Sequence, residues 1–284
     1  MRAKPDCIPC FLRQALTTAR MVTDDEAVHE RVLCEVMRRM ADKVDLSLSP
    51  AVLSTEAARI AAQSLGVYDP YAEVRRRFNE MCLDMYPRLK GMVERSPDPL
   101  HTAIKLAAAG NVIDLGAGDP SKLEEDIRRV IEDGFAVDHY PDFKSELEGA
   151  EAILYILDNS GEIVFDRVLM EEILKRGKHR IIAAVKSEPI LNDAVREDAE
   201  QAGITEIAGL IETGTGYLGA PLEKCSDDFL RAFREADLII SKGQANFETL
   251  DEAEGNIFFI LKAKCPIVAE RLGVRLNDMV FVRR

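Results

Sequence analysis

The feature that most constrains the fold is an apolar run that ends in polar residues and is followed by an amphipathic segment. Residues 152–157 are apolar on both faces, as a parallel strand must be when helices cover it on both sides. From Glu162 to Lys175 the apolar residues recur at three- and four-residue spacing, which predicts a helix. The polar residues 158–161 are therefore predicted to form a turn at the carboxyl edge of a parallel sheet.

Two further segments repeat this arrangement. Residues 179–186 form an apolar run that ends in a lysine, and residues 189–193 follow it and lead into a helix predicted to run to about Gln201. Residues 237–243 form a third such run, which ends in Ser-Lys-Gly. Carboxyl ends of parallel strands meet at one edge of an open α/β sheet, and ligands bind outside that edge. The sequence therefore predicts a functional site where these three runs end.

The side chains at this edge are suited to phosphoryl chemistry. Asp158, Asn159 and Asp193 offer hard oxygen donors, which are the ligands that Mg²⁺ and Mn²⁺ prefer. Lys186 and Lys242 offer cations that would neutralise phosphate oxygens. An alternative is that Asp158 and Asn159 only start the following helix, since Asp and Asn are common in turns and at N-caps. The recurrence at three strand ends favours a functional site.

Taken in order, these segments match a known pattern. The chain resembles the DUF89 family of damage-control phosphatases, also called ARMT1-like proteins, in the prokaryotic branch with an N-terminal cysteine pair. The matching pieces are CIPC at 7–10, GNVID at 110–114, DNSGE at 158–162 with FD at 165–166, KSEPILNDA at 186–194, SKGQANFE at 241–248 and KC at 264–265.

The resemblance implies a metal-dependent phosphatase that hydrolyses a small phosphorylated metabolite, such as a sugar phosphate or a cofactor-related ester, in metabolite damage control. It implies a divalent metal (Mg, Mn, Ni or Co) bound by three catalytic residues, Asp158, Asn159 and Asp193, with Lys242 as a fourth catalytic residue. It implies that substrate or phosphate is contacted by Glu162, Lys186, Asn192, Lys242, Gly243 and Asn246. Haloacid dehalogenase-type phosphatases need a second Asp where this chain has Ser160, so attack by water is favoured over a phospho-enzyme.

The helical and strand-like patterns divide the chain into two parts. Helical periodicity runs through residues 5–95, and short apolar runs alternate with amphipathic segments from Asn111 onward. We therefore predict a helical bundle domain over residues 1–99 and an α/β metal-binding catalytic domain over residues 100–284. With the resemblance, the second domain is expected to be Rossmann-like, with three α/β/α layers and a mainly parallel sheet.

Composition narrows the class of protein. The chain has 284 residues, of which 47% are hydrophobic, so it is large enough for two cores. A formal net charge of −13 argues against a nucleic-acid partner, because phosphate backbones require a basic face. No apolar run reaches the roughly 18 residues of a membrane span, and no signal peptide is recognisable. We therefore expect a soluble cytoplasmic enzyme with mostly reduced cysteines.

Cys7 and Cys10 form a CxxC motif that does not follow a strand, which argues against a thioredoxin-like redox motif. One alternative is a second site, of thiolate ligands, completed by another of the cysteines Cys34, Cys82, Cys225 or Cys265. The others are redox-sensitive thiols near the catalytic centre, or small apolar residues at the start of a helix.

Two other functions compete with the phosphatase. Residues 111–118 resemble the glycine-rich first motif of S-adenosylmethionine-dependent methyltransferases, for which Asp138 would hold the ribose. That function gives no reason for polar residues to recur at the ends of later strands. A non-catalytic metal- or metabolite-binding protein is the third possibility, and it would bind a ligand without turnover. Zinc-hydrolase and Ser-His-Asp sites have no support, because the histidines do not cluster: His29, His101, His139 and His179.

Overall fold

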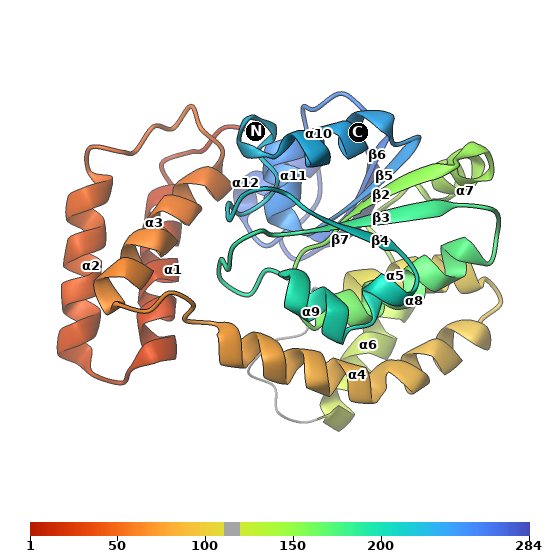
Figure 1. Ribbon diagram of the computed structural model, residues 1–284, viewed down its shortest axis with the longest axis horizontal. Helices are drawn as coiled ribbons and strands as arrows, with labels where there is room; N and C mark the ends of the chain where they lie inside the picture. The colour runs from red at the N-terminus through yellow and green to blue at the C-terminus, as the bar shows by residue number, and fades with distance from the viewer. Residues whose placement is uncertain (111–119) are drawn as a thin grey trace.

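A computed structural model describes residues 1–110 and 120–284, and it combines a three-helix unit with a seven-stranded sheet covered by helices on both faces (Figure 1). The glycine-rich segment 111–118, on which the methyltransferase alternative rests, lies outside the described residues. Within the described ranges, no helix has both the length and the apolar character needed to cross a membrane.

The first three helices form a unit with a core of their own. They are α1 (Cys7–Val22), α2 (Glu26–Met40) and α3 (Pro50–Leu65). The Asp25 carboxylate caps α2 by accepting from the backbone N–H of Ala27, and Ser49 caps α3. Their buried side chains include Phe11, Ala15, Ala19, Val32, Val36, Leu53, Ala57 and Ile60, and Ile267 of the α/β part joins them.

The sheet is mainly parallel, as predicted. In spatial order its strands are β1 (Val137–Asp138), β7 (Met279–Arg283), β6 (Ile257–Lys262), β5 (Leu238–Lys242), β2 (Ala152–Ile156), β3 (Arg180–Val185) and β4 (Gly209–Glu212). The five strands from β6 to β4 are parallel to one another, whereas β7 is antiparallel to β6 and pairs with β1. The carboxyl ends of five strands therefore share one edge.

The path of the chain changes direction at the centre of this sheet. From β2 it continues through β3 to β4 on one side, and then returns to add β5 and β6 on the other side of β2. The switch point therefore lies between β2 and β5. In open α/β sheets this is the position at which a crevice for ligands forms.

Helices cover both faces, which confirms the predicted three-layer α/β/α architecture (Figure 1). One face carries α4 (Ala72–Glu94), α5 (Pro99–Gly110), α6 (Pro120–Asp133), α7 (Tyr140–Gly149), α8 (Glu162–Leu174) and α9 (Arg196–Gln201). The other carries α10 (Asp227–Glu235), α11 (Gln244–Leu250) and α12 (Pro266–Leu272), and two short 3₁₀ helices, η1 (Ile204–Glu206) and η2 (Leu222–Lys224), lie in the connections.

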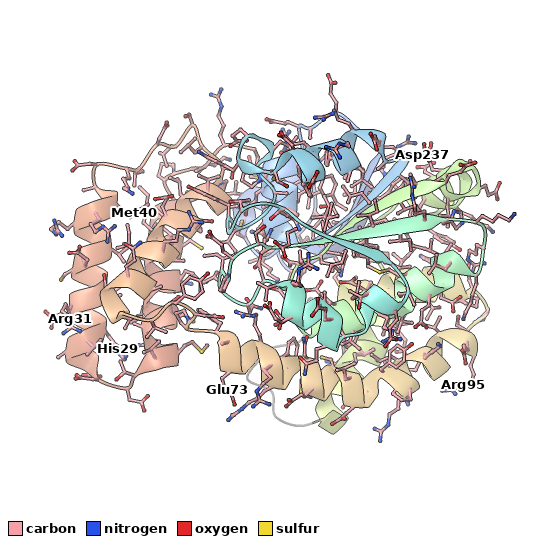
Figure 2. All side chains as sticks on the ribbon, in the orientation of Figure 1. His29, Arg31, Met40, Glu73, Arg95 and Asp237 are labelled. Atoms are coloured by element: carbon pink, nitrogen blue, oxygen red, sulfur yellow. The ribbon has the colours of Figure 1, made fainter. Side chains whose placement is uncertain are left out.

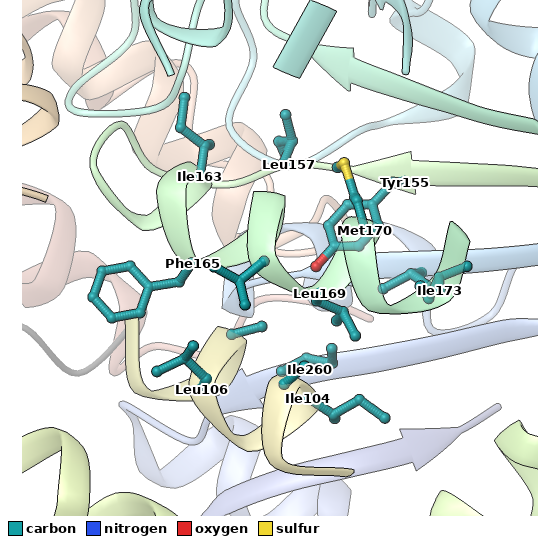
Figure 3. Close-up of a cluster of buried hydrophobic side chains, with 14 of the residues drawn as sticks. Ile104, Leu106, Tyr155, Leu157, Ile163, Phe165, Leu169, Met170, Ile173 and Ile260 are labelled. Atoms are coloured by element: carbon teal, nitrogen blue, oxygen red, sulfur yellow. The ribbon is translucent and has the colours of Figure 1, made fainter. Parts of the chain in front are cut away.

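Successive side chains of β2 point to opposite faces of the sheet and contribute to the hydrophobic core on each face. Tyr155 and Leu157 face α5 and α8, where Figure 3 shows them with Phe165 and Leu169 of α8. Leu154 and Ile156 face the opposite layer, with phenylalanines of α10 and α11. Because both faces are covered, the strand has to be apolar throughout, which is the pattern that its sequence shows.

Helix α4 packs against the sheet layer. Its buried apolar residues share a core with α5 and α8, and none of them belongs to the core of α1–α3: Phe78, Cys82, Met85, Leu89 and Val93. Its outer side is charged: Glu73, which Figure 2 shows there, pairs with Arg76 at 2.9 Å and with Arg77 at 2.6 Å. The division of the chain at residue 99 stays a prediction.

Candidate active site

The turn after β2 is fixed by a glycine and by α4. Gly161 has φ +72°, and a Cβ at this position would lie 2.1 Å from the ring of Phe78. The backbone N–H of Gly161 donates a hydrogen bond to Oδ1 of Asn79. Since the chain must pass close to α4 in a left-handed conformation, glycine is required here. Helix α8 then begins at Glu162.

The three predicted metal ligands lie together. Asn159 and Asp193 form an isolated antiparallel β-bridge, and the backbone N–H of Ala194 donates to the carbonyl of Asp158 at 2.8 Å. The side-chain amide of Asn159 donates to Oδ2 of Asp158 at 2.8 Å and to Oε2 of Glu162 at 2.9 Å. The turns after β2 and β3 are therefore joined side by side, while the ligand roles themselves stay predictions.

The carboxylates of this cluster repel one another in a buried setting. Burial, followed by the charges of Glu162 and Asp193, raises the pKa of Asp158 well above its usual range. Burial also raises the pKa of Asp193 to about 6, although the nearby ammonium of Lys186 acts in the opposite direction. Such a cluster favours a bound cation, because a positive charge would relieve both the repulsion and the desolvation.

Lys242, at the end of β5, lies beneath this cluster. Its side chain is 0% exposed, and its ammonium donates to Oε1 of Glu162 at 2.7 Å, to Oδ1 of Asp166 at 2.6 Å and to the carbonyl of Ala107 at 2.9 Å. Against the effect of burial, this ammonium lowers the pKa of Glu162. Burial raises the pKa of Asp166 to about 6, and the hydroxyl of Tyr155 donates to it at 2.7 Å. A contact between Lys242 and phosphate stays a prediction.

Lys186, at the end of β3, is also buried. Its ammonium donates to the carbonyl of Gly219 and lies 3.6 Å from Oδ2 of Asp193. It thus ties a carboxylate of the cluster to the loop before η2.

Gly243 and Asn246 join the end of β5 to the end of β2. Gly243 has φ +80°, and a Cβ on it would lie 1.9 Å from Oδ2 of Asp158, so only glycine allows the backbone this close. The side-chain amide of Asn246 donates to the carbonyls of Leu157 at 3.1 Å and Lys242 at 2.7 Å. Gly243 and Asn246, both predicted from the sequence, therefore join the end of β5 to the end of β2 next to Asp158.

A cavity of about 610 Å³ opens onto the cluster. One wall is the sheet edge, and the other is made by the start of α1 and the start of α3. Six of the residues predicted from the sequence line it: Cys7, Cys10, Asp158, Asn159, Asn192 and Asp193. The other five are not among its lining residues: Glu162, Lys186, Lys242, Gly243 and Asn246.

Lys264 also lines the cavity, although it is not among the site residues predicted from the sequence. It lies two residues beyond the end of β6, and its backbone N–H donates to Oε1 of Gln244 at 2.8 Å. Its side chain is exposed, and its charge lowers the pKa of Asp158 against the larger effects of burial and neighbouring carboxylates. A signal was present, because residues 257–261 are a fourth apolar run, and Lys262 and Lys264 follow it.

Three cysteines line the same cavity. Cys7 begins α1, Cys10 lies one turn later, and Cys265 is the N-cap of α12. The remaining candidates for a thiolate site lie elsewhere: Cys34 on α2, Cys82 in the core beside α8, and Cys225 after η2. In the part of the chain that the structure describes, no three His, Cys, Asp or Glu side chains are grouped to hold a metal ion. A thiolate site stays a prediction.

The acidic residue required by the methyltransferase alternative lies away from the cluster. Asp138 is in β1, at the far edge of the sheet from β4, and its carboxylate is 2.8 Å from Nε2 of His101.

Comparisons with known proteins agree over the whole chain. A family model described as the damage-control phosphatase ARMT1-like domain matches residues 3–280. Similar proteins include a damage-control phosphatase of Pyrococcus horikoshii, 35% identical over 285 residues, and one of Archaeoglobus fulgidus, 37% identical over 286 residues. The first match covers 100% of this chain and 98% of the relative, and the second covers 99% and 98%.

An uncharacterised protein of Methanocaldococcus jannaschii is 39% identical over 293 residues, which are 100% of this chain and 96% of that protein. Among solved structures, the crystal structure of a DUF89 family protein from Pyrococcus horikoshii matches with a TM-score of 0.92 at 35% identity. That match covers 100% of this chain and 99% of the solved one.

Proposed function

Because the chain belongs to the DUF89 family of ARMT1-like damage-control phosphatases, we propose that it hydrolyses a small phosphate ester with the help of a divalent metal ion. A phosphatase role in damage control is supported by the relatives that carry this name. The observation that carries the finer proposal is the gathering of Asp158, Asn159 and Asp193 at the base of one cavity.

These three residues fit a hard divalent ion. Oδ2 of Asp193 is buried and lies 3.6 Å from the ammonium of Lys186, but it accepts no hydrogen bond from the described residues. The amide group of Asn159 directs its hydrogens to Asp158 and Glu162, which leaves its carbonyl oxygen for another ligand. Two carboxylates and one amide oxygen would leave positions for water and for a substrate oxygen on Mg²⁺ or Mn²⁺. Ni²⁺ and Co²⁺ are further candidates.

The surrounding residues would hold this donor set in place. Lys242 fixes the carboxylate of Glu162, Glu162 accepts from Asn159, and Gly243 allows the end of β5 to approach Asp158. A divalent ion bound here would withdraw charge from the phosphoryl oxygens as the P–O bond breaks. We favour water as the nucleophile. A cavity of about 610 Å³ suits a small metabolite.

A metal-screened phosphatase assay tests the proposal. The protein is treated with a chelator, supplied in turn with Mg²⁺, Mn²⁺, Ni²⁺ or Co²⁺, and assayed for phosphate release from sugar, nucleotide and cofactor phosphates. We expect hydrolysis that depends on the metal, and a loss of about 100-fold or more in kcat/KM for Asp158→Asn. Asp228→Asn, on the exposed side of α10, is the matched control and should keep the parental rate.

Two results would overturn the proposal. One is that no ester is hydrolysed with any of the four metals, which together with tight metabolite binding would indicate a non-catalytic binding protein. The other is that Asp158→Asn keeps the parental rate, which would show that the ligand set is wrong.

A further inference from the structure

We infer that Lys264 is the residue whose ammonium binds the phosphoryl group of the substrate, whereas Lys186 and Lys242 hold the carboxylates of the site in place. The inference rests on the proposed phosphatase function and names a substrate-binding residue for it. Three observations support it: the partners of Lys242, the partners of Lys186, and the setting of Lys264 in the cavity.

Lys242 has no hydrogen left for a substrate. An ammonium group has three N–H donors, and Lys242 directs them to Glu162, Asp166 and the carbonyl of Ala107, at 2.7, 2.6 and 2.9 Å. Its side chain is fully buried and is absent from the lining of the cavity. A phosphate could reach this ammonium only if one of these three buried contacts were broken, and two of them are ion pairs whose loss is strongly unfavourable.

Lys186 is committed in a similar way. Its ammonium donates to the carbonyl of Gly219 and pairs with Asp193. The side chain lines a second cavity, with Arg196 and Glu212, instead of the one that contains Asp158. Its position supports Asp193 from behind, and that is the role of a positioning residue.

Lys264 differs from both in its surroundings. Its side chain is exposed and lines the cavity beside Asp158, and no described residue forms a hydrogen bond or an ion pair with its ammonium. Its backbone is nevertheless fixed, because the N–H is bound by Gln244, which follows Gly243 directly in the chain. Gly243 in turn touches the carboxylate of Asp158. The backbone of Lys264 is therefore held in place, while its ammonium remains available to a ligand.

The order of the strands explains this placement. β6, β5, β2 and β3 are adjacent and parallel, so the residues that follow them lie in a row along one edge of the sheet. Lys264 follows β6, Gly243 follows β5, and Asp158 follows β2. Lys264 thus faces the cluster from across the end of β5, on the side of β2 away from Asp193.

The acidic lining of the cavity explains why a phosphate-binding site here would need a cation. Five acidic residues line the cavity: Asp6, Asp158, Asp193, Glu248 and Glu270. Of its three basic lining residues, Lys4 is paired with Glu270 at 2.7 Å, and Arg13 belongs to the opposite wall on α1. A phosphate dianion would be repelled by the carboxylates unless a free cation offset their charge, and charge-assisted hydrogen bonds to phosphate are the strong ones.

The test compares Lys264→Ala and Lys264→Arg with Lys262→Ala as the matched control. Lys262 lies two residues earlier, at the end of β6, and lines a different cavity with Asn277 and Met279. Binding of inorganic phosphate to the metal-loaded protein is measured by calorimetry, together with kcat/KM for the best ester in the panel. Circular dichroism and the Tm check that each variant is folded.

We expect Lys264→Ala to weaken phosphate binding by about 10- to 100-fold and to lower kcat/KM by at least as much. Lys264→Arg should keep most of both, Lys262→Ala should match the parent, and metal affinity should change little in all three. The inference is overturned if Lys264→Ala binds phosphate as the parent does, or if only Arg13→Ala weakens phosphate binding.

Phosphate binding and ester hydrolysis are measured separately, so the inference about Lys264 and the proposed phosphatase function can fail independently. If phosphate binding depends on Lys264 but no ester is hydrolysed, the role of Lys264 in binding phosphate is supported and the proposed phosphatase activity is contradicted. Metal-dependent hydrolysis that is unchanged in Lys264→Ala would support the phosphatase and overturn the role of Lys264.

Discussion

Replacing Lys242 by Met should destabilise the protein by several kcal/mol. The ammonium of Lys242 contacts carboxylate oxygens of Glu162 and Asp166 at 2.7 and 2.6 Å, and all three side chains are 0% exposed. Removing one partner of a buried ion pair costs about 3–5 kcal/mol, because the other charge stays buried without it. Two carboxylates lose their cation here, so we expect the upper part of this range. Met fills a similar volume, which keeps any cavity small.

The cost should also depend on pH. The Lys242 ammonium lowers the pKa values of both Glu162 and Asp166, while their burial raises them. In the parent the pKa of Glu162 is below its usual value and that of Asp166 is above it. Without the ammonium both pKa values rise because burial is no longer opposed, so the folded variant binds extra protons. Stability gained from such protons is present at low pH and is lost as the pH rises through the folded pKa. Asp166, whose pKa is already about 6 in the parent, should take up the first proton.

Urea unfolding near pH 5 and near pH 8 measures both effects. The difference between the parent and Lys242→Met should be larger near pH 8, and adding Asp166→Asn to Lys242→Met should recover part of it. Lys262→Met, at the partly exposed end of β6, is the control and should cost about 0.5 kcal/mol or less. A cost for Lys242→Met below about 1 kcal/mol near pH 8, or one that does not change with pH, would refute this account of the buried network.

Three further predictions concern the cavity and the residues next to it. Gly243→Ala should lower kcat/KM by about 100-fold or more, because its Cβ would lie 1.9 Å from Oδ2 of Asp158; an unchanged rate in the metal-dependent assay would contradict the geometry. Burial raises the pKa of Glu248 from 4.5 to about 7, so the free energy of unfolding should fall by up to about 3 kcal/mol as the pH rises through this interval. Urea unfolding at several pH values should show that dependence in the parent and lose it in Glu248→Gln. If Cys7 and Cys10 are thiolate ligands, replacing both by Ser should lower the Tm and release zinc; an unchanged Tm and no zinc or iron on elemental analysis would leave them a packing role.

The central strand, turn and helix could be predicted because their signals are local. The apolar run 152–157 is observed as β2 (Ala152–Ile156), and the amphipathic segment after Glu162 is observed as α8 (Glu162–Leu174). A buried parallel strand has to be apolar on both faces, and a helix on its surface has to be apolar on one, so each pattern identifies its element. The carboxyl edge, and with it the position of the candidate site, follows from these two elements.

The surroundings of Lys186, Lys242 and Lys264 could not be predicted from such local patterns. Each lysine lies at or just beyond the end of an apolar run, so the local sequence gives all three the same appearance. Their environments differ because of residues far away in the chain: Glu162 and Asp166 enclose Lys242, and Gly219 binds Lys186. Whether a strand-end lysine is buried or faces the cavity depends on these long-range contacts, which periodicity does not record.

The placement of α4 shows the same limit. Periodicity predicts helices throughout residues 5–95, and the structure has one of them over Ala72–Glu94. Its apolar stripe fits any partner of suitable shape, so the pattern alone does not say which core it joins. Phe78 lies against Gly161 and Asn79 binds the N–H of the same residue, so the turn after β2 depends on a helix from the segment predicted to be a separate domain.

The cavity brings together segments that a ribosome makes at very different times. Cys7 and Cys10 of α1 form one wall, whereas Lys264 and Cys265 come from the segment after β6. A growing chain that has completed β3 already carries Asp158 and the wall from α1 and α3, but it still lacks Asp193, Lys264 and Cys265. The lining of the cavity is therefore complete only after the segment that follows β6 has been made.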